Sequence, residues 1–375
     1  MKKEDNYFHT YANINLNALE YNLKQIRQII DSKVKVLATV KANAYGHGIV
    51  EISNFLADKV DYLGVAYIEE GVLIRKSGVK TPILILGNTL DLGLKKALEY
   101  ELEVTITDEQ TAVKIDKIAS SLRKKAAIQI KIDTGMGRLG FWHKDALSAI
   151  KKINDLEHVE IKGLYTHLSS VDKDHDFTLK QLERFNHIIK NVEDAKINID
   201  IYHAANSLAT LHYKQAHFNL VRPGIILYGV YPDIASKRII DVKPILTLKT
   251  KVIYIKNVEA GRSISYGRTY IAKRDMRIAT LPVGYADGYT HLLTHKAKVL
   301  IKGKEVAVIG DICMDQIMID VSSIDSLVLG DEVILIGESG GKEINVEKLA
   351  QAAGTIPYEL LCWIGDRVKR IYIHN

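Results

Sequence analysis

Between about residues 14 and 240, the sequence has a regular alternation of two kinds of segment, which limits the folds that this chain can adopt. Short runs rich in β-branched residues alternate there with longer segments of helical periodicity. Such alternation is typical of a parallel sheet with crossover helices. Eight units in this span favour a (β/α)8 barrel, with an open doubly wound sheet as the alternative. The expected strands are 34–40, 62–66, 82–86, 101–106, 127–132, 159–167, 199–204 and 218–229.

The pattern changes after Pro244. Closely spaced strand-like runs, separated by Gly, Asp and Lys turns, predict a mainly antiparallel β domain, interrupted by one helix near 346–354. A chain of 375 residues exceeds the size of one hydrophobic core. No flexible linker separates the halves, so we expect a barrel over 14–240 packed on a β domain over 241–375, with a site at their junction.

The composition indicates in which compartment the protein works and which kinds of partner it does not bind. The opening segment, MKKEDNYFHTYANINL, lacks the apolar core of a secretory signal, and no apolar run reaches the ~18 residues of a membrane span. Two cysteines agree with a reducing compartment. The formal charge of +6 is scattered among acidic residues, whereas nucleic-acid binding requires a clustered basic face. We therefore expect a cytoplasmic protein that binds neither membranes nor nucleic acids.

The segment VKANAYGHG follows the first expected strand and contains Lys41. Barrel enzymes carry their chemistry at the carboxyl ends of the strands. A buried lysine loses its proton more easily, and the neutral amine can form an imine with an aldehyde. A solvated lysine at a strand end is the alternative. Gly46 and Gly48 either let the backbone approach a ligand or form a turn.

The segment KIDTGMGRLG contains the spacing G-x-G-x-x-G at Gly135, Gly137 and Gly140. A dinucleotide site also needs an acidic residue at the end of the next strand. That strand ends in Tyr-Thr-His instead, which argues against a dinucleotide. Arg138 is then either a fixed cation above the fifth strand or an ordinary surface arginine.

Two further segments, HAANSLAT and VRPGIILYG, close the seventh and eighth expected strands. Barrels often bind phosphate in these loops through backbone N–H groups and a hydroxyl. Ser207 and the amides of Gly224 and Ile225 suit that role. Arg222, beside them, either donates to a ligand or forms a structural ion pair.

Metal binding is not expected. His291 and His295 are four residues apart, but the segment HLLTH lacks the glutamate of H-E-x-x-H. In the β domain, tyrosines among turn residues can act as acids or bases only where the phenol pKa is lowered. Most of the 19 tyrosines must be packing residues.

Taken together and in this order, the motifs resemble those of alanine racemase over nearly the whole chain. They are VKANAYGHG, KIDTGMGRLG, YTHLSS, NS at 206–207, VRPGIILYG, SYGRTY, LPVGYADGY, GDICMDQ, GDEVILIG and GTIPYELL.

The resemblance implies a (β/α)8 barrel carrying pyridoxal 5'-phosphate and a C-terminal β domain, to which residues 1–13 add a strand. It also implies a homodimer in which each β domain completes the active site of the other chain. The implied reaction interconverts L-alanine and D-alanine and supplies D-alanine for peptidoglycan.

The resemblance also assigns roles to residues. Lys41 binds the cofactor as a Schiff base and is one of two catalytic bases; Tyr266, from the other chain, is the second. Arg138 and the backbone N–H of Met314 bind the substrate carboxylate. The remaining cofactor contacts are Tyr45, Ser207, Gly224, Ile225 and Tyr358 around the phosphate, with Arg222 at the pyridine nitrogen and His167 near it.

The implied chemistry needs a base on each face of the substrate, because racemisation removes the α proton from one side and returns it on the other. A cation such as Arg222 at the pyridine nitrogen leaves that nitrogen unprotonated and weakens the cofactor as an electron sink. In some family members, a lysine matching Lys131 is carbamylated.

Three alternatives share parts of this pattern. A racemase of serine or another amino acid would share every catalytic residue. A barrel decarboxylase with the same cofactor fits the β-domain motifs less well. A non-catalytic pyridoxal-phosphate-binding protein would be a single barrel without Tyr266. The sequence departs from the family at Lys369 and at Thr290-His291, positions commonly occupied by proline and by proline-arginine.

Overall fold

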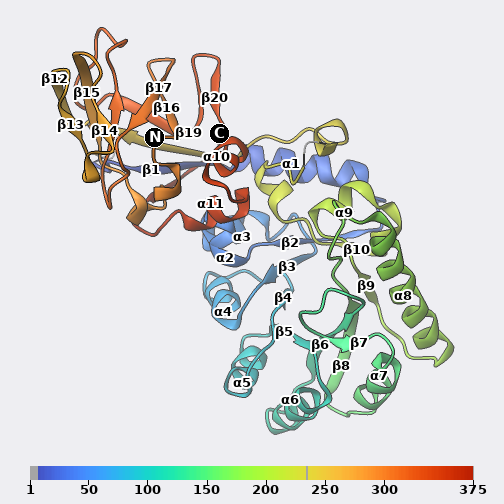
Figure 1. Ribbon diagram of the computed structural model, residues 1–375. Helices are drawn as coiled ribbons and strands as arrows, with labels where there is room; N and C mark the ends of the chain where they lie inside the picture. Colours follow the sequence, from blue (N-terminus) through green and yellow to red (C-terminus); the bar gives the residue numbers. More distant parts are fainter. Residues whose placement is uncertain (1–6, 234, 375) are drawn as a thin grey trace.

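The computed structural model describes residues 7–233 and 235–374. It contains a parallel barrel and a largely antiparallel β domain packed beside it (Figure 1). The expected (β/α)8 barrel with a C-terminal β domain is confirmed. In this part of the chain, no helix is both long enough and apolar enough to cross a membrane.

Eight parallel strands form the barrel in the order β10-β2-β3-β4-β5-β6-β8-β9. Two backbone hydrogen bonds close the ring, from Asn219 N to Tyr202 O at 3.4 Å and from Arg222 N to Ala205 O at 3.0 Å. The strands are β2 (Lys35–Thr39), β3 (Tyr62–Val65), β4 (Ile83–Ile85), β5 (Glu103–Ile106), β6 (Ala126–Asp133), β8 (Val159–Tyr165), β9 (Ile201–His203) and β10 (Leu220–Val221), with short β7 (Phe141–Trp142) beside β6.

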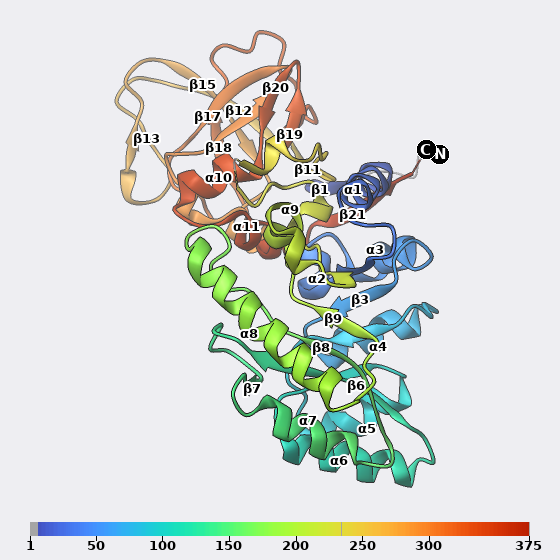
Figure 2. The same cartoon turned by 90° about the vertical axis from the view of Figure 1, so that its right-hand side faces the viewer.

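Amphipathic helices cover the outside of the barrel and bury their apolar faces against the strands. Figure 2 shows these helices along the outside of the barrel strands. Asp108 and Asp174 cap the starts of two of the helices by accepting hydrogen bonds from backbone N–H groups. The helices are α1 (Leu16–Ile29), α2 (Lys41–Tyr45), α3 (Ile49–Leu56), α4 (Ile68–Lys76), α5 (Asp91–Glu99), α6 (Glu109–Ser121), α7 (Ala146–Asn154), α8 (His175–Asp194) and α9 (Ser207–His212).

The eighth expected strand, 218–229, is wrong over most of its length. Only Leu220–Val221 is a strand, and Ile225–Tyr228 forms a 3₁₀ turn, η2. Pro223 has no N–H to continue a strand ladder. Gly229, at φ +76°, ends the turn at a position where a Cβ would collide with the carbonyl of Lys243. The apolar run is therefore buried as a turn.

The β domain has a ten-stranded sheet, with β20 beside β19 and the other strands in the order β12-β15-β18-β17-β16-β19-β11-β1-β21. All its pairs are antiparallel except β1 with β21, where Tyr11 lies opposite Lys369. The strands are β1 (Tyr11–Asn15), β11 (Leu246–Lys251), β12 (Tyr254–Val258), β15 (Met276–Leu281), β16 (Lys298–Ile301), β17 (Lys304–Ile309), β18 (Ile317–Asp320), β19 (Glu332–Ser339), β20 (Lys342–Ile344) and β21 (Lys369–Ile373).

Several shorter elements position the loops of this domain. The expected helix near 346–354 is α10 (Val346–Ala353), and a further helix, α11 (Pro357–Trp363), lies beside α2 of the barrel (Figure 1). The others are β13 (Ser263–Ile264), β14 (Tyr270–Ile271), η4 (Tyr266–Arg268), η5 (Tyr285–Asp287) and η6 (His291–Leu293).

Candidate active site

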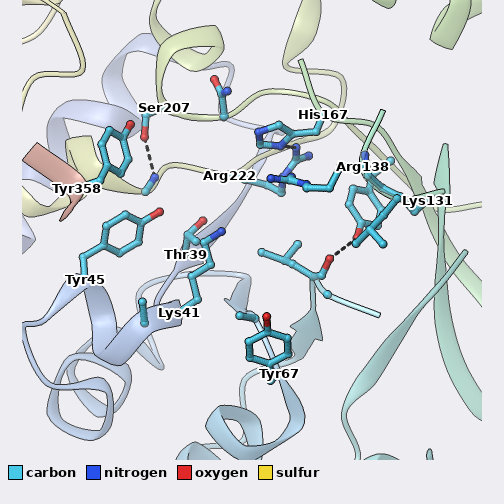
Figure 3. Close-up of a pocket in the computed structure, with 18 of the residues that line it drawn as sticks. Thr39, Lys41, Tyr45, Tyr67, Lys131, Arg138, His167, Ser207, Arg222 and Tyr358 are labelled. Carbon is cyan, nitrogen blue, oxygen red and sulfur yellow. Dashed lines mark hydrogen bonds between the residues drawn. The ribbon is translucent and has the colours of Figure 1, made fainter. Parts of the chain in front are cut away.

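A cavity of about 470 Å³ opens at the carboxyl ends of the barrel strands. Thr39, Lys41, Lys131 and Tyr165 line it from the barrel, while Tyr358 and Cys362 reach it from α11 (Figure 3). Its volume is in the range of small-molecule sites. Barrel enzymes carry their chemistry at this end of the strands.

The charges that line the cavity have one sign. Four basic side chains, Lys41, Lys131, Arg138 and Arg222, lie along it, and none of its lining residues within the described chain is Asp or Glu. Uncompensated cations in a partly enclosed space attract anions. The cavity is therefore suited to a ligand with phosphate or carboxylate groups.

Lys41 follows β2 and begins α2, whose backbone is unusual. Ala42, Asn43, Ala44 and Tyr45 all have φ near +53°, in the left-handed region that costs non-glycine residues about 1–2 kcal/mol each. The Glu70 carboxylate stabilises this turn by accepting hydrogen bonds from Ala42 N at 2.6 Å and Ala66 N at 2.7 Å. Strain of this kind persists where the surroundings fix it, often at functional sites.

The environment of Lys41 favours the neutral amine. Burial is the main cause of its lowered pKa, and the positive charge of Arg138 lowers the pKa further. A neutral amine is the form that adds to an aldehyde. Of the two interpretations left open for Lys41, the geometry supports the reactive one.

At one end of the cavity, Tyr45, Ser207 and Tyr358 lie close together (Figure 3). The Gly224 N–H donates to Ser207 Oγ at 2.8 Å, and a Cβ on Gly224 would lie 2.5 Å from Tyr45 Oη. The cavity thus ends in a cradle that only glycine leaves open. Burial raises the pKa of Tyr45 and of Tyr358, the latter to about 12, so both phenols are hydroxyl donors at neutral pH.

Arg222 is buried and has no carboxylate partner among the described residues. Its guanidinium donates to His203 Nδ1 at 2.7 Å, to the carbonyl oxygens of Thr166 and Ala204, and to His167 Nδ1 at 3.3 Å. Burial lowers the Arg222 pKa to about 10. Burial also holds the pKa of His167 and of His203 well below the usual range, and the positive charge of Arg222 lowers both further. The structural ion pair that was the alternative for Arg222 is therefore not observed among the described residues.

A chain of hydrogen bonds fixes this arginine from inside the barrel. Because His203 Nδ1 accepts from Arg222, the ring proton must be on Nε2, which donates to Gln129 Oε1 at 2.7 Å. Gln129 Nε2 donates in turn to Glu103 Oε2 at 2.7 Å. The groups that contact the guanidinium directly are neutral, and the Glu103 carboxylate is separated from it by His203 and Gln129.

Lys131 and Arg138 lie at the opposite end from Tyr45 (Figure 3). Lys131 is buried over the Tyr165 ring, and burial, with help from Arg222 and Arg138, lowers its pKa well below the usual value. The loop before Arg138 is organised by Asp133, whose carboxylate accepts from the N–H groups of Gly135 and Gly137. These amides are thus engaged within the loop, unlike those of a dinucleotide site.

Gly46 and Gly48 accommodate the C-terminal segment of the chain, which resolves their role in favour of a turn. A Cβ on Gly46 would collide with the carbonyl of Leu361, and one on Gly48 with the hydroxyl of Tyr372. Neither glycine lines the cavity. Ile225 does not line it either, because its side chain is buried in the core at the start of η2.

Tyr266 and Met314 lie outside the cavity, exposed by 72% and 56%. Their loops are adjacent, since Ser265 Oγ donates to Asp311 O at 2.7 Å and lies 3.6 Å from Cys313 Sγ. These two residues therefore share a face of the β domain without touching the cavity of their own chain.

Some lining residues were not predicted from the sequence. Thr39 and Tyr165 end β2 and β8, so their place at the carboxyl ends of strands was a usable signal. Tyr67 and Cys362 lie in a loop and in α11, where no sequence pattern indicated the cavity. No cluster of three or more His, Cys, Asp or Glu among residues 7–233 and 235–374 is arranged to hold a metal.

Comparison with protein families matches both halves of the chain. Residues 14–232 match the alanine racemase N-terminal domain, and residues 245–372 match the alanine racemase C-terminal domain. Among similar curated proteins, the alanine racemase of Halothermothrix orenii is 41% identical over 97% of this chain and 96% of its own. That of Methanococcus maripaludis is 43% identical, over 97% and 98%.

Solved structures agree over the same length. An alanine racemase from Clostridium difficile superposes with a TM-score of 0.94 at 40% identity, covering 98% of this chain and 96% of that one. The alanine racemase from Bacillus anthracis with bound L-Ala-P superposes with a TM-score of 0.92 at 33% identity, over the same fractions.

Proposed function

Because this chain belongs to the alanine racemase family, we propose that it interconverts L-alanine and D-alanine in the cavity at the carboxyl end of the barrel. The observation that carries this proposal is a partly buried lysine, with a lowered pKa, in a cavity whose lining in the described chain has four basic side chains, Lys41 included, and no acid. The family depends on pyridoxal 5'-phosphate, and these residues fit that group.

Residues in two parts of the cavity would fit the cofactor. The open cradle at Gly224, with the hydroxyls of Tyr45, Ser207 and Tyr358 around it, suits the phosphate. Arg222, which lacks a carboxylate partner in the described chain, suits an acceptor such as the pyridine nitrogen, with His167 beside it. Lys41 Nζ would hold the cofactor covalently, and the backbone near Ile225 would complete the phosphate site.

When bound, the cofactor carries the amino group of the substrate and withdraws electrons from its Cα. The chain has then to bind the carboxylate, exclude water and move one proton. Arg138 supplies a cation for the carboxylate at the far end of the cavity. Lys41 Nζ, with its lowered pKa, takes the α proton on one face.

The second base is Tyr266 of another subunit, in our proposal. Tyr266 is exposed on the β domain and lies outside the cavity of its own chain. A homodimer would bring it, with the Met314 N–H, to the open face of the partner's site. Tyr266 Oη would then return a proton on the face opposite Lys41, and the roles would reverse for the other enantiomer.

We further propose the domain division 14–240 and 241–375, with the first 13 residues joining the β domain. Residues 1–6 lie outside the described part of the chain, and β1 (Tyr11–Asn15) pairs with β11 and β21. The product D-alanine would enter cytoplasmic peptidoglycan synthesis.

A racemisation assay over a panel of L-amino acids tests the activity. We expect the holoenzyme to racemise alanine faster than serine or lysine. A preference for another amino acid would change the substrate, and activity on none would favour a cofactor-binding protein.

Substituting Tyr266→Phe tests the two-base assignment. We expect the variant to retain the cofactor absorbance near ~420 nm that is typical of its imines, yet to lose most racemisation, because the phenolic proton is gone. Tyr254→Phe, at another exposed tyrosine of the β domain, should keep normal activity. Normal activity in Tyr266→Phe would remove this residue from the mechanism.

A further inference from the structure

Arg370, a half-buried residue of β21, donates only to backbone carbonyl groups. Its Nε and Nη2 donate to Gly46 O at 3.1 and 2.9 Å, and Nη2 donates also to Ile364 O at 2.6 Å. Its Nη1 donates to Gly365 O at 2.6 Å and to Val368 O at 2.8 Å. A guanidinium has five N–H groups, so each of them has an acceptor.

The acceptors of Arg370 lie at the ends of two helices that meet. Gly46 is the C-cap of α2, while Ile364 and Gly365 directly follow α11. The last carbonyl groups of a helix have no partner within it, and a basic side chain near that end can satisfy them. The two helices approach closely, since a Cβ on Gly46 would lie 2.0 Å from Leu361 O. Arg370 thus holds the ends of α2 and α11 together.

Each of these helices carries one wall of the cradle at the end of the cavity. Tyr45 is the last residue of α2 and precedes Gly46, and Tyr358 lies in the first turn of α11. Their ring centroids are 6.0 Å apart, and both rings line the cavity. Helices as short as these have little stability of their own. The spacing of the two phenols therefore depends on the junction that Arg370 holds.

We propose that Arg370 is a positioning residue that holds Tyr358 against Tyr45 and thereby makes the cradle selective for a phosphate group. The inference rests on the proposed function, which places the cofactor phosphate beside these phenols. Arg370 is not among the residues of the described chain that line the cavity. It acts through α2 and α11 rather than by contact with the cofactor.

Arg75 provides a matched control at the opposite end of the barrel. It too is half-buried, and burial lowers the pKa of both guanidinium groups. It donates to the carbonyl groups of Val79, Thr81, Tyr100 and Glu101 at 2.7–3.1 Å. These acceptors precede β4 and β5, and none of them lines the cavity. A change at Arg75 therefore removes similar hydrogen bonds without touching the cradle.

The test compares two ligands of the apoprotein. Pyridoxal has the aldehyde and the ring of pyridoxal 5'-phosphate but no phosphate, so the ratio of the two dissociation constants measures the selectivity of the cradle. In Arg370→Lys an ammonium replaces the planar fork and cannot span four carbonyl groups. We expect the preference for the phosphorylated ligand, from absorbance titration, to fall about tenfold, because a hydrogen bond from Tyr358 to a charged group is lost. Arg75→Lys should keep the preference of the wild type.

An unchanged preference in Arg370→Lys, or an equal fall in Arg75→Lys, would overturn the role of Arg370. A wild-type protein that binds both ligands equally would instead remove the phosphate cradle, and with it the cofactor site of the proposed function. The two failures are therefore distinguishable.

If Arg370→Lys does not fold, hydrogen exchange in the wild-type apoprotein decides. Inorganic phosphate should slow exchange of the backbone amides at 364–368, because a filled cradle stabilises the junction against local opening. Exchange at 77–81, next to Arg75, should not change. Exchange at 364–368 that is the same with and without phosphate would overturn the proposal.

Discussion

The missing side chain at residue 224 shapes the cradle formed by Tyr45, Ser207 and Tyr358. A Cβ there would lie 2.5 Å from Tyr45 Oη. In Gly224→Ala the tyrosine ring must move, and overpacking of this kind costs about 1–3 kcal/mol. We expect the affinity of apoprotein for pyridoxal 5'-phosphate to fall about tenfold, measured by absorbance titration. Gly365→Ala, whose Cβ would come no closer than 3.3 Å to another atom, should bind normally; equal affinity in both variants would contradict the phosphate assignment.

The positive charge of Arg138 adds to the effect of burial in lowering the pKa of Lys41. Imine formation needs neutral Nζ, and Arg138, after burial, is the main cause of the lowered Lys41 pKa. Arg138→Gln removes a positive charge, so the pKa rises and less neutral amine is present at a given pH. The rate of cofactor rebinding to apoprotein should therefore reach half its maximum at a higher pH than in the wild type, measured by stopped-flow absorbance. An unchanged midpoint, or an equal shift in Arg123→Gln on the exposed surface, would refute the coupling.

Sequence motifs alone predicted several of the side chains that line the cavity. Lys41, Ser207 and Arg222 all line the cavity. Cys362 was missed because it enters from a helix about 320 positions along the chain from Lys41, and only the tertiary packing of α11 on α2 makes them neighbours.

Among the elements, the left-handed turn α2 is stabilised by the carboxylate of Glu70. Each Glu70 oxygen accepts from one backbone N–H, of Ala42 and of Ala66. In Glu70→Gln one of these amides faces an NH₂ group, and losing a hydrogen bond to a charged group costs about 1–3 kcal/mol. We expect the free energy of unfolding in urea to fall by that amount and cofactor affinity to weaken, because Lys41 begins the turn.

Glu69 provides the control for this change. It is the preceding residue of α4, is exposed, and carries the same charge. Glu69→Gln should alter the free energy of unfolding by less than about 0.5 kcal/mol. A similar loss in both variants would attribute the effect to net charge rather than to the support of α2.

The periodicity of the sequence predicted helices and strands correctly, except where a proline, a glycine or a tertiary contact imposed another conformation. The run 218–229 has the composition of a strand, yet Pro223 and the close approach at Gly229 convert most of it to the turn η2. The left-handed conformation of α2 was not predictable from Ala42 or Ala44, which favour right-handed helix; their conformation depends on the tertiary contacts of Glu70.

At the scale of the molecule, the barrel and the β domain have separate tasks. The barrel supplies the four basic side chains and most of the cradle, while α11 contributes Tyr358 and Cys362 to the cavity from the β domain (Figures 1 and 3). The face with Tyr266 and Met314 is turned to solvent. If Lys41 and Tyr266 are the two bases, as we propose, a single chain has one base in its cavity and the other on an exposed surface, and the proposed two-base reaction needs a second chain.

Mixed dimers test this requirement. Lys41→Ala and Tyr266→Phe should each be inactive as purified homodimers. In a heterodimer of the two, one site combines two altered residues, and the other combines intact Lys41 with intact Tyr266 of the other subunit. Random co-assembly gives heterodimers in half of the dimers, so co-expression should restore about a quarter of wild-type racemisation, assayed by D-alanine formation. If both bases acted within one chain, every site in the mixture would lack one of them, and the co-expressed protein would remain inactive.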